Sequence, residues 1–216
     1  MGDPLFDAIL AAPDDDAARL VWADREGGAR GELVVLQCSL AARTAPADQR
    51  ELFARRAGEL VRAHGAEWTP LASYARPTFV RGFVEEVTIA LAELEGRAET
   101  IWRDEPLVRT LVVTDVAQYA VISSDGRYPW AIAAVTLEDV FARIPPGKVT
   151  SLALSPFAEA TGIWEDLYRR PADFGRVCVR AVAGAPSLAR VEEIVIPGVP
   201  DARALLAEQR GIRAPR

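Results

Sequence analysis

A six-residue pattern, apolar at its first, fourth and sixth positions, occurs four times in the second part of this chain. In each copy the last three residues alternate as a β-strand does, which sends two side chains into a core, and the first apolar residue anchors the approach to the strand. A chain that repeats such a unit is expected to stack its strands side by side in one sheet. The four copies are Val84–Ile89, Val108–Val113, Val149–Leu154 and Val191–Ile196.

The spacing of the copies predicts parallel strands joined by helices, because a parallel connection needs a dozen or more residues. The copies begin 24, 41 and 42 residues apart. Two further windows, 132–137 and 174–179, also fit the pattern but leave only about eleven residues before the next strand, so we interpret them as crossover helices. The extra length then falls in two insertions, 115–129 and 155–173, which we expect to be ordered loops.

The first third of the chain is typical of helices. Asp3 before Pro4 predicts a helix start, and the acidic run 14–16 suits the start of a second helix, which Gly27-Gly28 ends. We expect His64 to complement the dipole at the end of the fourth helix. The expected helices cover 4–12, 14–24, 31–43 and 47–64, with Gly65 after the last, and a final helix covers 201–210.

Pro70 and Pro77 mark a connection between the helices and the rest of the chain. From Phe79 onward, strand-like and helix-like segments alternate. We therefore predict two domains, a helical domain over 1–78 and a repeat domain over 79–216 that ends in a capping helix. The expected fold class is α/β, with an N-terminal helical cap followed by a short, irregular solenoid that has a parallel sheet.

Several segments carry a resemblance to one family. The segment Ala11–Asp24, with Arg30–Leu33 and Leu36-Gln37, resembles the bacterial repeat-companion domain at the N terminus of leucine-rich-repeat proteins. Arg81–Val84 and Pro186–Ile196 are similar to the repeat region of the same proteins. The resemblance implies degenerate leucine-rich repeats and a scaffold or recognition role without enzymatic activity.

Charge and hydropathy argue against two classes of partner. The chain carries 25 basic and 31 acidic residues, a net charge of −6 that opposes binding to nucleic acid. The uncharged stretches reach only ten residues, whereas a membrane-spanning helix needs about 20 apolar residues. The start of the chain has no basic region followed by an apolar core, so we expect a cytoplasmic protein. The arginines at 210, 213 and 216 are expected to be solvated.

The residues that usually carry catalysis are scarce. His64 is the only histidine, and Cys38 and Cys178 lie in apolar contexts where buried reduced thiols are expected. The sequence contains no nucleophile elbow, zinc motif, P-loop or dinucleotide fingerprint. We therefore expect no enzymatic activity, no cofactor and no metal.

The strand pattern instead predicts a binding surface. Residues between the core positions must point to the opposite face of the sheet, the face with which solenoids bind. The middle of this row is small and neutral and its ends carry glutamates, which suits a protein or peptide partner with basic flanks. Aromatic residues of the insertions, at 119, 128, 130, 157, 164 and 168, would add anchors or fix the loops. The predicted row is Glu86, Thr88, Thr110, Val112, Ser151, Ala153, Glu193 and Val195.

Two other hypotheses stay open. A metal-dependent enzyme or regulator would bring carboxylates of the N-terminal helices together in one pocket. Alternatively, the chain is a substrate or subunit of a larger assembly. The carboxylates in question are Asp14, Asp15, Asp16, Asp24 and Glu32.

Overall fold

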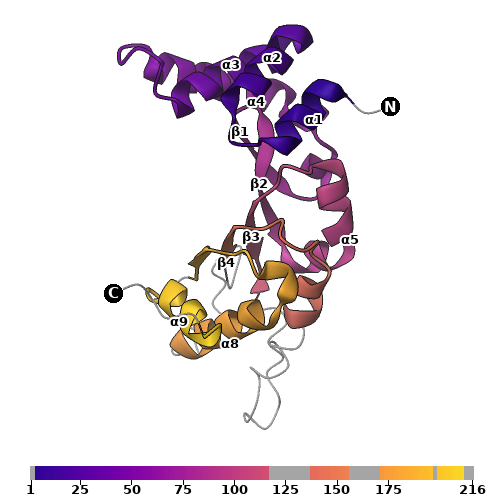
Figure 1. Cartoon of the computed structure of the whole chain (residues 1–216), viewed down its shortest axis with the longest axis vertical. Helices are drawn as coiled ribbons and strands as arrows, with labels where there is room; N and C mark the ends of the chain where they lie inside the picture. The colour runs from indigo at the N-terminus through magenta and orange to yellow at the C-terminus, as the bar shows by residue number, and fades with distance from the viewer. Residues whose placement is uncertain (1–2, 117–136, 156–170, 197–198, 212–216) are drawn as a thin grey trace. The chain divides into compact units, whose positions relative to one another are not determined.

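The computed structural model describes residues 3–116, 137–155, 171–196 and 199–211 (Figure 1). These residues are mixed α/β, and their strands form a five-stranded sheet in the order β1-β2-β3-β4-β5. The chain divides into two compact units, which we describe one at a time. Unit 1 comprises Met1–Glu86 with Asp104–Leu107, and unit 2 comprises Val87–Arg103 with Val108–Arg216. The division falls inside β2 (Phe83–Ala90), whereas the sequence led us to expect a boundary near residue 78.

Unit 1 begins with four helices, of which the first two start with the predicted capping, whereas the third and fourth start at Gly28 and Arg50, without a side-chain cap, instead of at 31 and 47. The Asp3 carboxylate accepts a hydrogen bond from Leu5 N at 3.1 Å, and Asp15 accepts one from Ala17 N at 2.9 Å. Gly27 ends the second helix with a φ of +64°, a conformation that favours glycine. The helices are α1 (Pro4–Ala11), α2 (Asp16–Glu26), α3 (Gly28–Ala41) and α4 (Arg50–Trp68).

The fourth helix is longer than the sequence predicts, and Gly65 does not end it. Gly65 is buried within α4, and a Cβ built on it would lie 3.4 Å from the Phe79 ring. Trp68, in the extra turn, packs against Phe79 edge to face, with 5.9 Å between ring centroids. The prediction for Gly65 was wrong because packing against Phe79 outweighs the preference of glycine for helix ends. His64 accordingly lies inside α4, stacked on Trp68 at 5.5 Å.

A β-hairpin that the sequence analysis did not predict follows the 3₁₀ helix η1 (Pro70–Ser73). Its first strand is β1 (Arg76–Val80), and its turn consists of Arg81 and Gly82, with φ of +49° and +86°. Positive φ at both turn residues is typical of the tight turns that fit the twist of a hairpin. The hairpin turn packs against α3, since a Cβ on Gly82 would lie 2.1 Å from Val34 Cγ2.

Unit 2 contains the repeated pattern apart from the first three residues of its first copy, and the prediction of which pattern residues are buried is confirmed. All twelve apolar pattern positions are buried, including Ile89, Val113, Leu154 and Ile196. Strand β3 pairs with β4 and β4 with β5, both in parallel, as expected. Figure 1 shows that α5 and α8 both lie alongside these strands. The elements are α5 (Leu91–Asp104), β3 (Thr110–Thr114), β4 (Ser151–Leu154), α8 (Pro171–Gly184), η4 (Pro186–Leu188), β5 (Glu193–Val195) and α9 (Ala202–Gln209).

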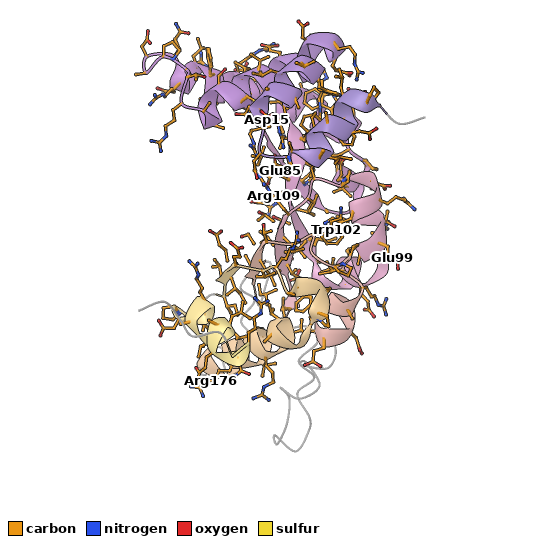
Figure 2. The ribbon with its side chains drawn as sticks, viewed as in Figure 1. Asp15, Glu85, Glu99, Trp102, Arg109 and Arg176 are labelled. Carbon is orange, nitrogen blue, oxygen red and sulfur yellow. The ribbon has the colours of Figure 1, made fainter. Side chains whose placement is uncertain are left out.

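The helices of unit 2 present one side to the strands. In α5, Trp102 is buried and donates a hydrogen bond from its ring nitrogen to Val108 O at 2.9 Å, whereas Glu99 points away into solvent (Figure 2). The helical assignment of 174–179 is confirmed because that window lies within α8. Residues 137–142 are also helical, and the rest of the window 132–137 lies outside the described residues.

The C-terminal helix forms as predicted, and the arginine that follows it is hydrogen-bonded to the segment that leads into β5. Arg210 donates hydrogen bonds to Val191 O at 2.8 Å and to Leu188 O at 2.6 Å, so it is not the solvated residue that we expected. Most of both insertions, with all six of their aromatic residues named above, lies outside the described residues, as do Arg213 and Arg216. None of the helices in the described ranges is both long enough and apolar enough to cross a membrane.

Candidate partner-binding site

The outer face of β3, β4 and β5 in unit 2 brings six of the eight predicted binding residues together. The parallel register pairs equal positions of the repeated pattern, so that the outward residues form continuous rows across the strands. The core residues Leu111, Leu152 and Ile194 form a buried row between them, on the opposite face. One outward row is Thr110, Ser151 and Glu193, and the other is Val112, Ala153 and Val195.

The two rows have the chemistry of a neutral floor with an acidic end. Threonine, serine, alanine and valine side chains are short, so a partner backbone can approach the sheet closely. Exposure rises toward β5, where Val195 is 62% exposed and Glu193 is exposed. An exposed apolar side chain beside a carboxylate can contact an apolar residue and a cation of the same partner.

The remaining two predicted residues lie on β2, on either side of the division between the units. Thr88 belongs to unit 2 and is half-buried, which agrees with an outward position on its strand. Glu86 belongs to unit 1, where it accepts a hydrogen bond from the Thr78 hydroxyl at 3.3 Å. Glu86 is therefore not placed with the six residues of the strand face.

Four of the five carboxylates of the alternative metal hypothesis cap a helix or pair with an arginine. Asp15 caps α2, while Asp14 and Asp16 approach the Arg81 guanidinium at 3.2 and 3.5 Å. Glu32 forms a two-pronged ion pair with Arg56 at 2.7 and 2.8 Å. Within the described ranges, no three histidine, cysteine, aspartate or glutamate side chains are grouped as a metal would require.

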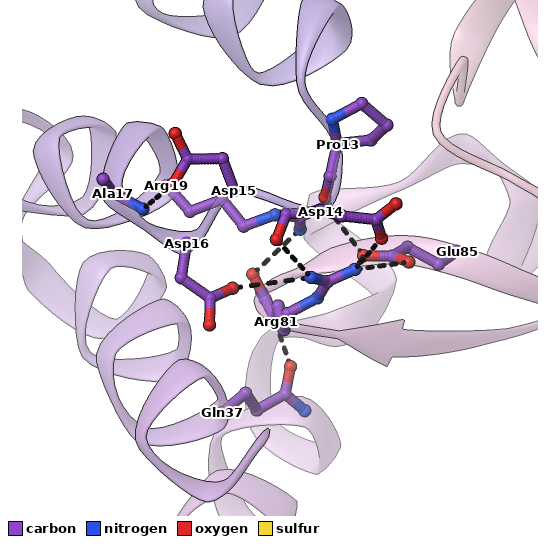
Figure 3. A network of polar contacts seen from close by, with 10 residues as sticks. Pro13, Asp14, Asp15, Asp16, Ala17, Arg19, Gln37, Arg81 and Glu85 are labelled. Atoms are coloured by element: carbon purple, nitrogen blue, oxygen red, sulfur yellow. Dashed lines mark hydrogen bonds and ion pairs between the residues drawn. The ribbon is translucent and has the colours of Figure 1, made fainter. Parts of the chain in front are cut away.

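A polar cluster in unit 1 joins the helices to the hairpin (Figure 3). At its centre, Arg81 contacts Asp14, Asp16 and Glu85, with 3.4 Å between its Nη2 and Glu85 Oε2. Burial opposes the charged form of Arg81, but Glu85 and Asp14 outweigh it and raise the Arg81 pKa above its ordinary value. Gln37 completes the cluster, since it accepts from Gly82 N at 2.7 Å and donates to Phe79 O at 2.9 Å.

Arg19 is the most deeply buried charge of the cluster. Its side chain is fully buried, and its Nη2 lies 2.8 Å from Glu85 Oε1. It also donates to Pro13 O and Arg81 O, at 2.6 and 3.3 Å. Burial lowers the pKa of Arg19, and the opposite charge of Glu85 counteracts this shift. These contacts are all internal, so the cluster fixes the hairpin on the helices.

A second cation of unit 1, the half-buried Arg30, lies against aromatic rings. Its guanidinium lies 4.8 Å from the centre of the Trp68 ring, 4.9 Å from Phe79 and 5.6 Å from Phe83. Burial lowers the Arg30 pKa to about 10, which leaves the group charged at neutral pH. Attraction between the cation and the ring faces compensates part of the cost of burial. Arg30 therefore has a packing role among the described residues.

Neither cysteine is poised for chemistry. Both are free and buried, as predicted. Burial, assisted by Asp16, raises the pKa of Cys38 to about 12, and burial also raises that of Cys178. A thiol that stays protonated at neutral pH is a poor nucleophile and a poor metal ligand.

Sequence reasoning found the strand face but missed the polar cluster of unit 1. Arg19 lies on α2 among residues typical of an amphipathic helix, where arginine normally faces solvent. The dipeptide Arg81-Gly82 lies between two short apolar runs, and its glycine was the signal that could have revealed the hairpin turn.

Searches of protein-family models, curated proteins and solved structures find no match to this chain.

Proposed function

We propose that this chain is a non-enzymatic module that binds a protein or peptide partner through the outer face of β3, β4 and β5. The observation that carries the proposal is the register, which aligns Thr110 with Ser151 and Glu193, and Val112 with Ala153 and Val195. A sheet face made of small neutral residues, with an exposed valine and a glutamate at one end, supports recognition of an apolar segment with a basic flank.

The proposal includes the architecture that the resemblance implies. Strands β3, β4 and β5 follow one another in chain order, are parallel and are separated by helical segments. This arrangement supports a short, irregular leucine-rich-repeat-like solenoid, for which α1–α4 and α9 serve as the caps. We also propose a cytoplasmic location, no cofactor, and a contribution of the two insertions to the partner surface.

The test compares two substitutions on the strand face with two matched substitutions elsewhere on the surface. Glu193→Arg and Val195→Arg alter the strand face, and Glu99→Arg and Val21→Arg serve as matched controls at an exposed glutamate of α5 and a valine that is 55% exposed on α2. Each variant is used to capture partners from the cell of origin, with quantitative mass spectrometry as the readout.

We expect the two strand-face variants to lose the same captured protein while their melting temperatures and those of the controls stay within a few degrees of the original chain. Equal capture by all five chains would contradict the proposal. Loss of capture that follows a large fall in melting temperature would contradict it as well, because the residues would then be structural.

A further inference from the structure

Unit 1 contains an open groove of about 460 Å³ between α3, α4 and β1. Its floor is mainly apolar and is built from small residues of α4, together with Leu40, Val61, Pro77 and Phe79. The small residues are Ala54, Ala57 and Gly58. Because all of these residues belong to unit 1, the groove is distinct from the strand face of unit 2.

Gly58 keeps the groove open at a cost to the helix. A glycine in a helix interior destabilises it relative to alanine. At Gly58 neither backbone nor packing requires glycine, since φ is not positive and a Cβ would meet only the Arg62 side chain, at 3.5 Å. Gly31 and Gly65, by contrast, lie against Ala23 O and the Phe79 ring.

Two arginines give the groove a positive charge. Arg76 lines it from β1, and the contact with Gly58 places the guanidinium of Arg62 at its edge. Both side chains are exposed, and neither forms an ion pair with any residue in the described part of the chain. Glu86, a carboxylate on the neighbouring strand β2, accepts a hydrogen bond from Thr78. Two unpaired cations beside an apolar floor stand out in a chain of net charge −6.

We infer that this groove binds a protein segment that presents apolar side chains flanked by carboxylates. The apolar side chains would cover Ala57, Val61 and Phe79, and the carboxylates would pair with Arg62 and Arg76. A protein segment is favoured over a small molecule because the groove is open, whereas small-molecule sites enclose most of the ligand surface. The surface is thus a second interaction site, of opposite charge preference to the strand face.

The test uses two pools of eight-residue peptides with Leu, Phe or Trp at two central positions. One pool has Asp or Glu on both sides of these positions, and the other has Lys or Arg. Each pool is titrated into the ¹⁵N-labelled full chain. We expect the acidic pool alone to shift the amide resonances of Ala54, Gly58, Val61 and Thr78. Equal shifts from both pools, or shifts from neither, would overturn the inference.

Matched variants separate binding from folding. Gly58→Leu fills the groove and favours the helix, so it should raise the melting temperature while abolishing the response to the acidic pool. Gly96→Leu, at an exposed glycine of α5 with no atom near its Cβ position, should raise the melting temperature and retain the response. The double change Arg62→Ala/Arg76→Ala should weaken binding about tenfold or more. A response that survives in Gly58→Leu would refute the inference.

Other occupants are distinguished by two further measurements. Phosphatidylglycerol vesicles that bind the original chain but not Gly58→Leu, with no response to the acidic pool, would assign the groove to lipid and overturn the inference. Self-association that Gly58→Leu abolishes, again without a response to the acidic pool, would assign it to a second copy of the chain. Neither result would bear on the strand face, which Glu193→Arg tests separately.

Discussion

Arg19 and Glu85 form an ion pair of 2.8 Å between α2 and β2 in which the two side chains are 0% and 4% exposed. Glu85 has a second cationic neighbour, Arg81, at 3.4 Å, whereas Arg19 otherwise contacts the carbonyls of Pro13 and Arg81 and the Phe83 ring, 5.2 Å from its centre. The pair is thus unequal: Glu85 keeps a counter-charge if Arg19 is removed, whereas no second carboxylate among the described residues forms an ion pair with Arg19.

This inequality predicts that Glu85→Gln destabilises the protein more than Arg19→Met does. Removing one partner of a buried ion pair leaves an uncompensated charge and costs about 3–5 kcal/mol. We expect that range for Glu85→Gln and a loss smaller by about 1–2 kcal/mol for Arg19→Met. Urea denaturation of the two variants measures both. Equal losses would mean that Arg81 does not compensate Glu85.

The close approach of Gly82 to α3 predicts that two glycines with positive φ differ in how much a substitution by alanine destabilises the protein. A Cβ on Gly82 would lie 2.1 Å from Val34 Cγ2, whereas a Cβ on Gly27 would meet no atom within 4 Å. Gly27→Ala should therefore cost only the backbone strain, about 1–3 kcal/mol. Gly82→Ala should cost at least about 2 kcal/mol more, because Val34 or the turn must move. Similar unfolding free energies for the two variants would show that the turn does not rely on close approach.

The start of α1 predicts a pH dependence in the acid range. The hydrogen bond from Arg25, together with that from Leu5 N, lowers the pKa of Asp3 from 3.8 to about 2. Because the folded-state pKa lies below the unfolded value, this carboxylate stabilises the protein above about pH 4, and the contribution disappears as the pH falls toward 2. Carboxyl NMR titration should show the Asp3 pKa moving up toward 3.8 in Arg25→Gln. An Asp3 pKa that stays near 2 in this variant would rule out Arg25 as the cause.

Burial of the two thiols predicts that they do not react with alkylating reagents in the folded protein. With the pKa of Cys38 raised to about 12 and that of Cys178 also raised, iodoacetamide should modify neither in the native protein at pH 8. Both should react once urea unfolds the chain. Mass spectrometry of the alkylated protein gives the number of modified cysteines, and rapid native modification of Cys38 would contradict its buried position.

The strands of unit 2 were predictable because their signal is local. Alternation of apolar residues marks the buried side of a strand, and equal pattern positions such as Leu111 and Leu152 pair in the structure. The same alternation identified the outward residues Val112 and Ala153. The prediction of where α4 ends failed, because the contact between Gly65 and Phe79 joins residues that are distant in sequence and overrides the local preference.

The polar cluster could not be predicted either, because its partners are also distant in sequence. Nothing near Arg19 in the sequence indicates that its counter-charge is Glu85, which follows 66 residues later. Strand β1 was missed because Pro77 and its exposed neighbours obscure the alternation that a strand usually shows. The groove beside it was missed as well, since it depends on the positions of three separate elements.

Strand β2 supplies Phe83–Glu86 to unit 1 and Val87–Ala90 to unit 2, so the two units have no linker between them at this point. A gene fusion that joined these helices to another sheet after residue 78 would lose Arg81, Gly82 and Glu85 and leave Arg19 buried without its counter-ion. Recombination between such proteins would therefore have to carry the chain through Glu86, together with Asp104–Leu107, along with the helices.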